Sequence, residues 1–298
     1  MDAEAKARFD ALLETRKPPD DPTSNLFRGM IYSTDGVGKT ILSMMIAQLI
    51  TPPDKKIAFV DAHNGWKVIN NPRWKARNLG KRTQPFQYQG WSQLQTLSQL
   101  IQANHKDFNY GCVILDELSY MEGIDIQRVH TQHVAAGKKD TDEDVPGWGE
   151  YNPAKNRYKK MMDDLLEAGT HIIAVSHRRE EFNKAKQLII TPDFIPSIRK
   201  EILRPFDFCG YLTADMVTAE NDPGKVQYER KVQVHPTKLI TAKTKIDDLP
   251  LNVSATDLPV IIQEWIAGER TTAVEDNSVF NDPSTILEDD DYQPTEIA

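Results

Sequence analysis

The sequence predicts an α/β fold with a mostly parallel central sheet and helices on both faces. Between residues 26 and 176, short continuous apolar runs alternate with helical segments, a pattern typical of strands that are buried on both faces. From about residue 205 the runs follow one another with only turn residues between them. This change indicates antiparallel strands at the C-terminal side of the sheet.

Four apolar runs are interpreted as the parallel strands. They read LFRGMIY from residue 26, KIAFVD from 56, GCVILD from 111 and HIIAVS from 171. The three later strands interpreted as antiparallel read FDFCGYLTAD from 206, KVQYERKVQV from 225 and KLITAKT from 238. Ligands of open parallel sheets bind at the carboxyl ends of the strands, so the residues that follow the four parallel runs are the first candidates for a site.

Helices are expected between and after these strands. KTILSMMIAQLI from residue 39 is stopped by two prolines, and SQLQTLSQLI has Ser92 as its expected N-cap. Asn152 and Pro153 are expected to open the helix that Gly169 closes. LPVIIQEWIAGE from residue 258 is expected to be the last helix.

The chain divides into three expected parts. Residues 1–24 are interpreted as a helix and linker, 25–270 as the core, and 271–298 as an acidic disordered tail. The net charge of -8 comes entirely from the tail, which holds eight of the 44 acidic residues and none of the 36 basic ones. The remainder is formally neutral, so the acidic balance does not exclude nucleic-acid binding by the core.

Composition excludes several classes of protein. Two cysteines among 298 residues are too few for a disulfide framework, and no apolar run approaches the length of a membrane span. The charged N-terminus lacks the apolar segment of a signal peptide. We therefore expect a cytoplasmic protein that does not associate with a membrane.

The segment IYSTDGVGKTILS, residues 31–43, resembles a phosphate-binding loop with one substitution. Ser33 stands where that motif begins with glycine, and a serine with negative φ can serve there. The alternative is a glycine turn with a chance lysine. The predicted nucleotide-binding residues are Ser33, Thr34, Asp35, Gly36, Val37, Gly38, Lys39 and Thr40.

Three further residues complete the predicted site. Asp116 ends an apolar strand and is expected to hold Mg²⁺ together with the Thr40 hydroxyl. Glu117 follows it and is the predicted general base, with a solvated loop acid as the alternative. His177 could contact the γ-phosphate, or it could be an ordinary surface histidine.

With these strand ends in order, and LITAKTKIDDLP after them, residues 25–268 resemble the RecA-like ATPases. The similarity is greatest to phage members that act in single-strand annealing and recombination. The resemblance implies a RecA-like P-loop NTPase core that uses ATP and Mg²⁺. It also implies that Lys243 and Lys245 act at a neighbouring subunit's nucleotide, although two lysines on one face could be a plain surface pair. His63 departs from the family, which has a catalytic glutamate there.

The resemblance further implies partners and a location. The implied partners are single-stranded DNA and other copies of the chain, which assemble head to tail in a ring or filament. The implied location is the cytoplasm of a bacterial host. DNA-binding loops are expected at about 122–150 and 178–200, with ordinary solvated loops as the alternative. The predicted DNA-binding residues are Arg178, Arg179, Lys184, Lys186, Arg199 and Lys200.

Two other functions fit the same residues. One is a helicase motor or a helicase loader, and the other is a P-loop interaction protein that does not hydrolyse ATP. The tail could compete with DNA for a basic groove, serve only for solubility, or dock a single-strand-binding or other replication protein.

Overall fold

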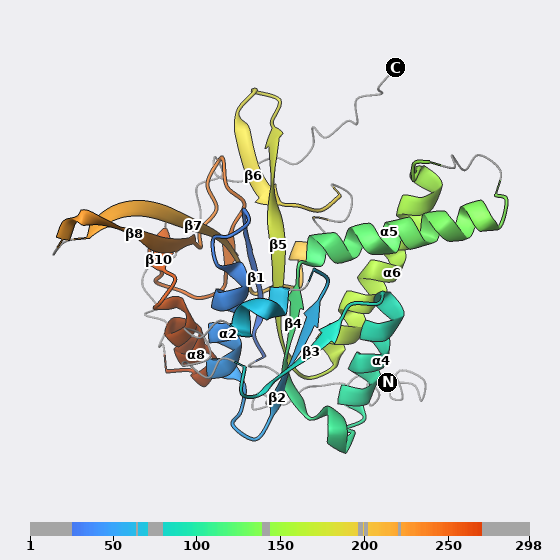
Figure 1. Ribbon diagram of the computed structural model, residues 1–298, viewed down its shortest axis with the longest axis horizontal. Coiled ribbons are helices and arrows are strands. Elements are labelled where there is room, and N and C mark those ends of the chain that lie inside the picture. Colours follow the sequence, from blue (N-terminus) through green and yellow to red (C-terminus); the bar gives the residue numbers. More distant parts are fainter. Residues whose placement is uncertain are drawn as a thin grey trace, which may run out of the picture.

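The computed structural model describes residues 26–63, 65–70, 80–138, 144–195, 199, 202–219 and 222–269. In this part of the chain a ten-stranded sheet is flanked by helices (Figure 1). The expected N-terminal helix at 1–24 and the acidic tail at 271–298 lie outside the described residues.

The seven predicted strands occur in the predicted order along the chain. The strands are β1 (Arg28–Ser33), β2 (Lys56–Asp61), β3 (Thr83–Gln87), β4 (Tyr110–Asp116), β5 (His171–Phe182), β6 (Leu188–Pro192), β7 (Phe208–Ala219), β8 (Asp222–Gln233), β9 (Lys243–Thr244) and β10 (Asn252–Ser254). Of these, β3, β6 and β10 are strands that the sequence did not predict. The main path of the sheet runs β10-β8-β7-β1-β5-β4-β2-β3. From β7 to β3 the neighbours are parallel, whereas β8 and β10 are antiparallel. The predicted fold class is confirmed.

The strand register brings Asp61 and the predicted site residues to one edge. Ser33 at the end of β1 is paired with His177 in β5. Asp61 at the end of β2 is paired with Asp116 at the end of β4. Since these strands are parallel, their carboxyl ends meet on the side of the sheet where the glycine loop leaves β1.

Helices cover both faces of the sheet. They are α2 (Lys39–Ile50), α4 (Trp91–Gln102), α5 (Leu118–Ala135), α6 (Trp148–Glu167) and α8 (Leu258–Ala267), with short 3-10 turns η2 (Gly65–Asn70) and η3 (Lys106–Phe108). Alternate residues of β4 enter two separate cores. Val113 and Leu115 pack in the cluster that contains α4 and α6, and Ile114 packs in the cluster that contains α2 and α8. None of the described helices is long and apolar enough to cross a membrane.

Two predicted helix starts are wrong. Gly90, rather than Ser92, is the N-cap of α4. Its φ of 117° is one that glycine adopts without strain. The helix α6 begins at Trp148, before Pro153 rather than after it. The Glu150 carboxylate accepts a hydrogen bond from the backbone N–H of Gly147 at 2.7 Å, and this cap allows the helix to start one turn earlier.

The predicted DNA-binding loops are also corrected. Residues 118–135 form the helix α5, which buries Met121 and Val129. Residues 178–192 belong to an antiparallel hairpin, because β5 continues past its buried part and pairs with β6. Of KLITAKT, only Lys243–Thr244 forms a strand. Two β-ribbons, β5–β6 and β7–β8, therefore extend from the body (Figure 1).

Candidate nucleotide site

The glycine loop connects β1 to the N-terminus of α2. Gly36 has a φ of 73° and Gly38 a φ of 109°, both in the left-handed region that favours glycine. The Gly38 carbonyl accepts the first helical hydrogen bond from Leu42 at 3.0 Å. The backbone N–H groups of the first turn of α2 are therefore available for an anion at the end of this loop.

Ser33 fits the loop start and adds a contact that the sequence did not predict. It is not among the described residues with positive φ, as the motif requires. Its buried hydroxyl donates to the Leu212 carbonyl in β7 at 2.5 Å. The serine therefore fastens the beginning of the loop to the neighbouring strand, which glycine cannot do.

Lys39 is nearly inaccessible, with 5% of the side chain exposed. Its Nζ donates to the Thr34 carbonyl at 3.0 Å and lies 3.6 Å from Glu117 Oε1. Asp35 is the other nearby acid, at 3.8 Å. The lysine charge is thus held inside the curve of the loop, where the phosphates of a nucleotide would lie.

Asp116 and Thr40 meet across the site. Thr40 Oγ1 lies 3.2 Å from both carboxylate oxygens of Asp116. Burial, with smaller contributions from neighbouring Glu117 and Asp61, raises the pKa of Asp116 to about 7. Mg²⁺ binds to oxygen ligands, and a hydroxyl beside a buried carboxylate supplies such ligands. Thr40 and Asp116 therefore fit the expected metal.

The segment after β2 is shaped around the same carboxylate. Asp61 accepts hydrogen bonds from the backbone N–H groups of His63 at 2.8 Å and Trp66 at 3.0 Å. This brings Gly65 so close that a Cβ there would lie 2.3 Å from Asp116 Oδ2. At position 65, only glycine leaves enough space for the Asp116 carboxylate. Neither Asp61 nor Gly65 was predicted as a site residue.

Glu117 and His177 are in contact beside the loop. Glu117 Oε2 lies 2.6 Å from His177 Nε2, and Asp35 Oδ1 lies 3.1 Å from His177 Nδ1. The contact with Glu117 is the main cause that raises the pKa of His177. One possible ligand atom from each of Asp35, Glu117 and His177 lies within 4.8 Å of the other two, a spacing that also suits the binding of a cation. Glu117 has a φ of 65°, so the backbone turns sharply between β4 and α5.

Comparison with known families agrees with this geometry. A family model described as an AAA domain matches residues 26–246, which is most of the chain. The chain belongs to the AAA domain family. Comparison with curated proteins found no match. Membership of this family indicates a nucleotide-binding P-loop ATPase-type domain, and the matched range contains the loop and the strand ends described above.

Outside the nucleotide site, the predicted DNA-binding arginines form ion pairs with acidic side chains of the same AAA domain. Arg178 lies 2.6 Å from Glu180, and Arg199 lies 2.5 Å from Glu181. Arg179 is within 4.0 Å of Glu181 as well. Lys184 and Lys186 are exposed near the turn of the β5–β6 hairpin, and Lys200 lies outside the described residues. The charge that the arginines present to solvent is therefore partly neutralised.

The two lysines expected to act between subunits lie far from the loop of their own AAA domain. Lys245 Nζ is 2.7 Å from Asp207 Oδ1, and Lys243 Nζ donates to the Arg204 carbonyl at 2.9 Å. Asp207 is hydrogen-bonded through its N–H to Arg28, at the start of β1. The loop leaves the other end of that strand, roughly 17 Å away at the usual rise per residue.

Replacing Ser33 tests the contact with Leu212. We expect both Ser33→Ala and Ser33→Gly to lower the free energy of unfolding by about 1 kcal/mol or more, because a buried carbonyl loses its hydrogen-bond donor. Urea unfolding monitored by circular dichroism measures the change. Ser33→Gly should be the less stable of the two, since glycine adds backbone freedom to the unfolded chain. Parent-like stability in both variants would show that the hydroxyl contributes nothing.

Proposed function

We propose that this AAA domain binds ATP with Mg²⁺ at residues 33–40 and hydrolyses it. The observation that carries the proposal is the convergence of Lys39, Thr40, Asp116 and Glu117. These residues come from the start of α2 and from the end of β4, and they meet within hydrogen-bond or ion-pair distance. A buried lysine, a hydroxyl and two acids are the groups that phosphoryl transfer to water requires.

Each residue has a distinct task in this proposal. The β- and γ-phosphates take the place of Glu117 as the partner of Lys39, which frees that carboxylate. Thr40 and Asp116 would hold Mg²⁺, which would neutralise phosphate charge when bound. Glu117 then accepts a proton from the attacking water. His177 contacts both Glu117 and the loop, so it holds the base in place until the γ-phosphate arrives.

Two variants separate binding from turnover. We expect Lys39→Ala to lose most ATP affinity, because the phosphates lose their main counter-charge. Glu117→Gln should retain ATP binding and lower the hydrolysis rate by about 10²-fold or more, the scale of a lost general base. Calorimetric binding and steady-state phosphate release measure the two effects, with Lys56→Ala, an exposed lysine at the start of β2, as the control. Normal turnover in Glu117→Gln would exclude it as the base.

We further propose that the protein acts on single-stranded DNA in phage recombination or strand annealing, as a RecA-like member of the AAA domain family. The support is the resemblance of residues 25–268 to the RecA-like ATPases, in which the same motifs follow one another in the same order. A helicase motor or loader is the main alternative, and a non-hydrolysing interaction protein is the other. A strand-annealing protein pairs complementary strands without unwinding a duplex, whereas a helicase unwinds it. DNA-stimulated ATP hydrolysis excludes the non-hydrolysing alternative.

The acidic tail offers a test of DNA binding. If the tail competes with DNA for a basic groove, deleting residues 271–298 should tighten single-stranded DNA binding at low salt, where screening is weak. The gain should shrink as salt rises. Fluorescence anisotropy with a labelled oligonucleotide measures the affinity. An unchanged affinity at low salt contradicts competition and leaves the solubility and protein-docking roles of the tail.

Lys243 and Lys245 are proposed to act at the nucleotide of a neighbouring copy in a head-to-tail assembly. Their distance from their own loop supports this, since both lie near the opposite end of β1. A basic side chain brought to the γ-phosphate by a neighbour stabilises charge in the transition state. Each subunit would then supply the loop for one nucleotide and the lysines for the next.

Mixing two inactive variants tests the shared site. Lys39→Ala and Lys243→Ala subunits should each be impaired alone and recover part of the ATPase activity when combined, because some interfaces then pair an intact loop with an intact lysine. Activity is measured across mixing ratios, and co-assembly is checked by sedimentation. No recovery in mixed assemblies would contradict action between subunits.

A further inference from the structure

The groups expected to act on the terminal phosphate lie on one side of the loop only. Asp116 is the last residue of β4, Glu117 follows it, and His177 lies on β5. In the sheet, β5 and β4 are on one side of β1, and β7 and β8 are on the other. If the γ-phosphate faces Glu117, the nucleoside end of the same nucleotide leaves the loop toward the β7–β8 ribbon.

The ribbon reaches the loop through Arg230. Its Nε donates to the Val37 carbonyl at 2.7 Å, a contact between residues 193 positions apart. A Cβ on Gly38 would lie 3.3 Å from the same Nε. The guanidinium group of Arg230 therefore rests against the loop on the side opposite the catalytic acids.

The face of the ribbon that carries Arg230 continues outward as an apolar pair. Arg230 is paired with Ala214 and Tyr228 with Met216 in the antiparallel register. Side chains two residues apart on a strand share a face, so Tyr228 and Met216 lie next beyond Arg230. Both are unusually exposed for their type, Tyr228 at 58% and Met216 at 67%.

We propose that Tyr228, Met216 and Arg230 form a platform for the base of the nucleoside triphosphate bound at the loop of the same subunit. The inference rests on the proposed function and adds the part of the ligand that the loop does not hold. Aromatic rings and guanidinium planes both stack on bases, and a thioether adapts to a flat apolar surface.

The position of the platform suits this ligand. Tyr228 lies two residues before Arg230 in β8, nearer the β7–β8 turn and roughly 7 Å away, within reach of a nucleoside whose phosphates occupy the loop. Lys231 and Glu229 alternate with these residues and form an ion pair at 2.9 Å, so the opposite face of the ribbon is charged.

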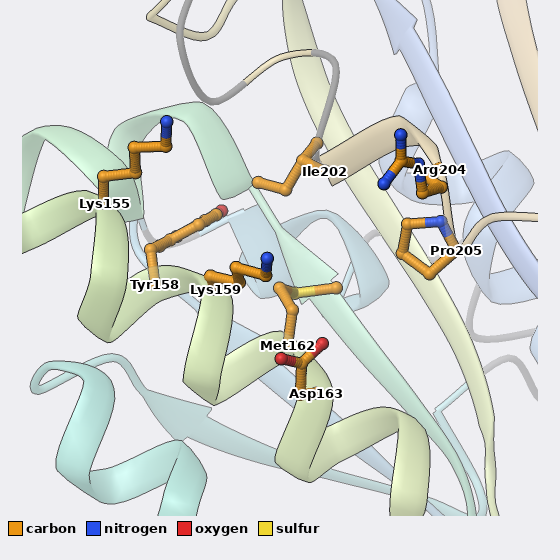
Figure 2. A pocket seen from close by; sticks show the side chains of 8 residues that line it. All are labelled: Lys155, Tyr158, Lys159, Met162, Asp163, Ile202, Arg204 and Pro205. Atoms are coloured by element: carbon orange, nitrogen blue, oxygen red, sulfur yellow. The ribbon is translucent and has the colours of Figure 1, made fainter.

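The pocket between α6 and residues 202–205 is a separate feature (Figure 2), and its lining includes the basic residues Lys155, Lys159 and Arg204. None of the residues that line this pocket belongs to the loop at 33–40.

Comparing ATP with inorganic tripolyphosphate tests the platform, because only ATP carries a base. We expect Tyr228→Ala to weaken ATP binding about 10-fold, the scale of one lost stacking contact, and to leave the affinity for tripolyphosphate unchanged. Tyr228→Phe should retain the parent affinity, since the ring is kept. Phe182→Ala removes an exposed aromatic side chain from the other ribbon and should change neither affinity. Titration calorimetry with Mg²⁺ and without DNA measures the affinity of the parent and of each variant for both ligands.

Other outcomes overturn the platform in distinguishable ways. If the parent prefers ATP to tripolyphosphate and Tyr228→Ala does not alter this, the base is bound elsewhere. Equal weakening of both ligands would mean that the loop itself was disturbed. A change in sedimentation alone would make the apolar pair a contact between copies of the chain. If the parent binds both ligands equally, the platform is wrong and the proposed function stands; if it binds neither, the proposed function fails as well.

Discussion

The site depends on the burial of one carboxylate. Asp116 is almost completely buried at the end of β4. Burying a charged carboxylate costs free energy unless a cation or hydrogen-bond donors compensate the charge. Thr40 supplies one donor, Lys39 lies nearby, and Gly65 leaves the space that the carboxylate occupies. The raised pKa of Asp116 reflects the charge that is still uncompensated. The glycine loop and the strand ends are arranged around this requirement.

Much of the fold could be predicted because the parallel strands are buried on both faces. Continuous apolar runs ending at Asp61 and Asp116 have few other interpretations. The helix α5 lacked such a signal, because its inward face carries charged residues. Glu122 and Asp125 are buried there, and Asp125 accepts a hydrogen bond from the Tyr88 hydroxyl. Burial raises the pKa of Glu122 to about 7. A helix with acids on its inner face does not show the expected periodicity.

The residues of the loop were predicted from their spacing, but their partners were not. Ser33 contacts Leu212, and Arg230 contacts Val37, across 179 and 193 positions of sequence. Such contacts depend on β7 and β8 lying beside β1, an order that local sequence does not encode. The arginines of the β5–β6 hairpin appeared available for DNA for a different reason. Glu180 and Glu181 follow Arg178 and Arg179 by two residues on the same strand, and they share a face with them only because β5 continues as a strand through these positions.

The β7–β8 ribbon is attached to the loop at two points. Ser33 holds the beginning of the loop to β7, and Val37, near its end, accepts a hydrogen bond from β8. The ribbon extends beyond the sheet (Figure 1), and these two hydrogen bonds join its base to both ends of the loop. Any displacement of the ribbon relative to the sheet would therefore have to break these bonds or move the loop backbone with it.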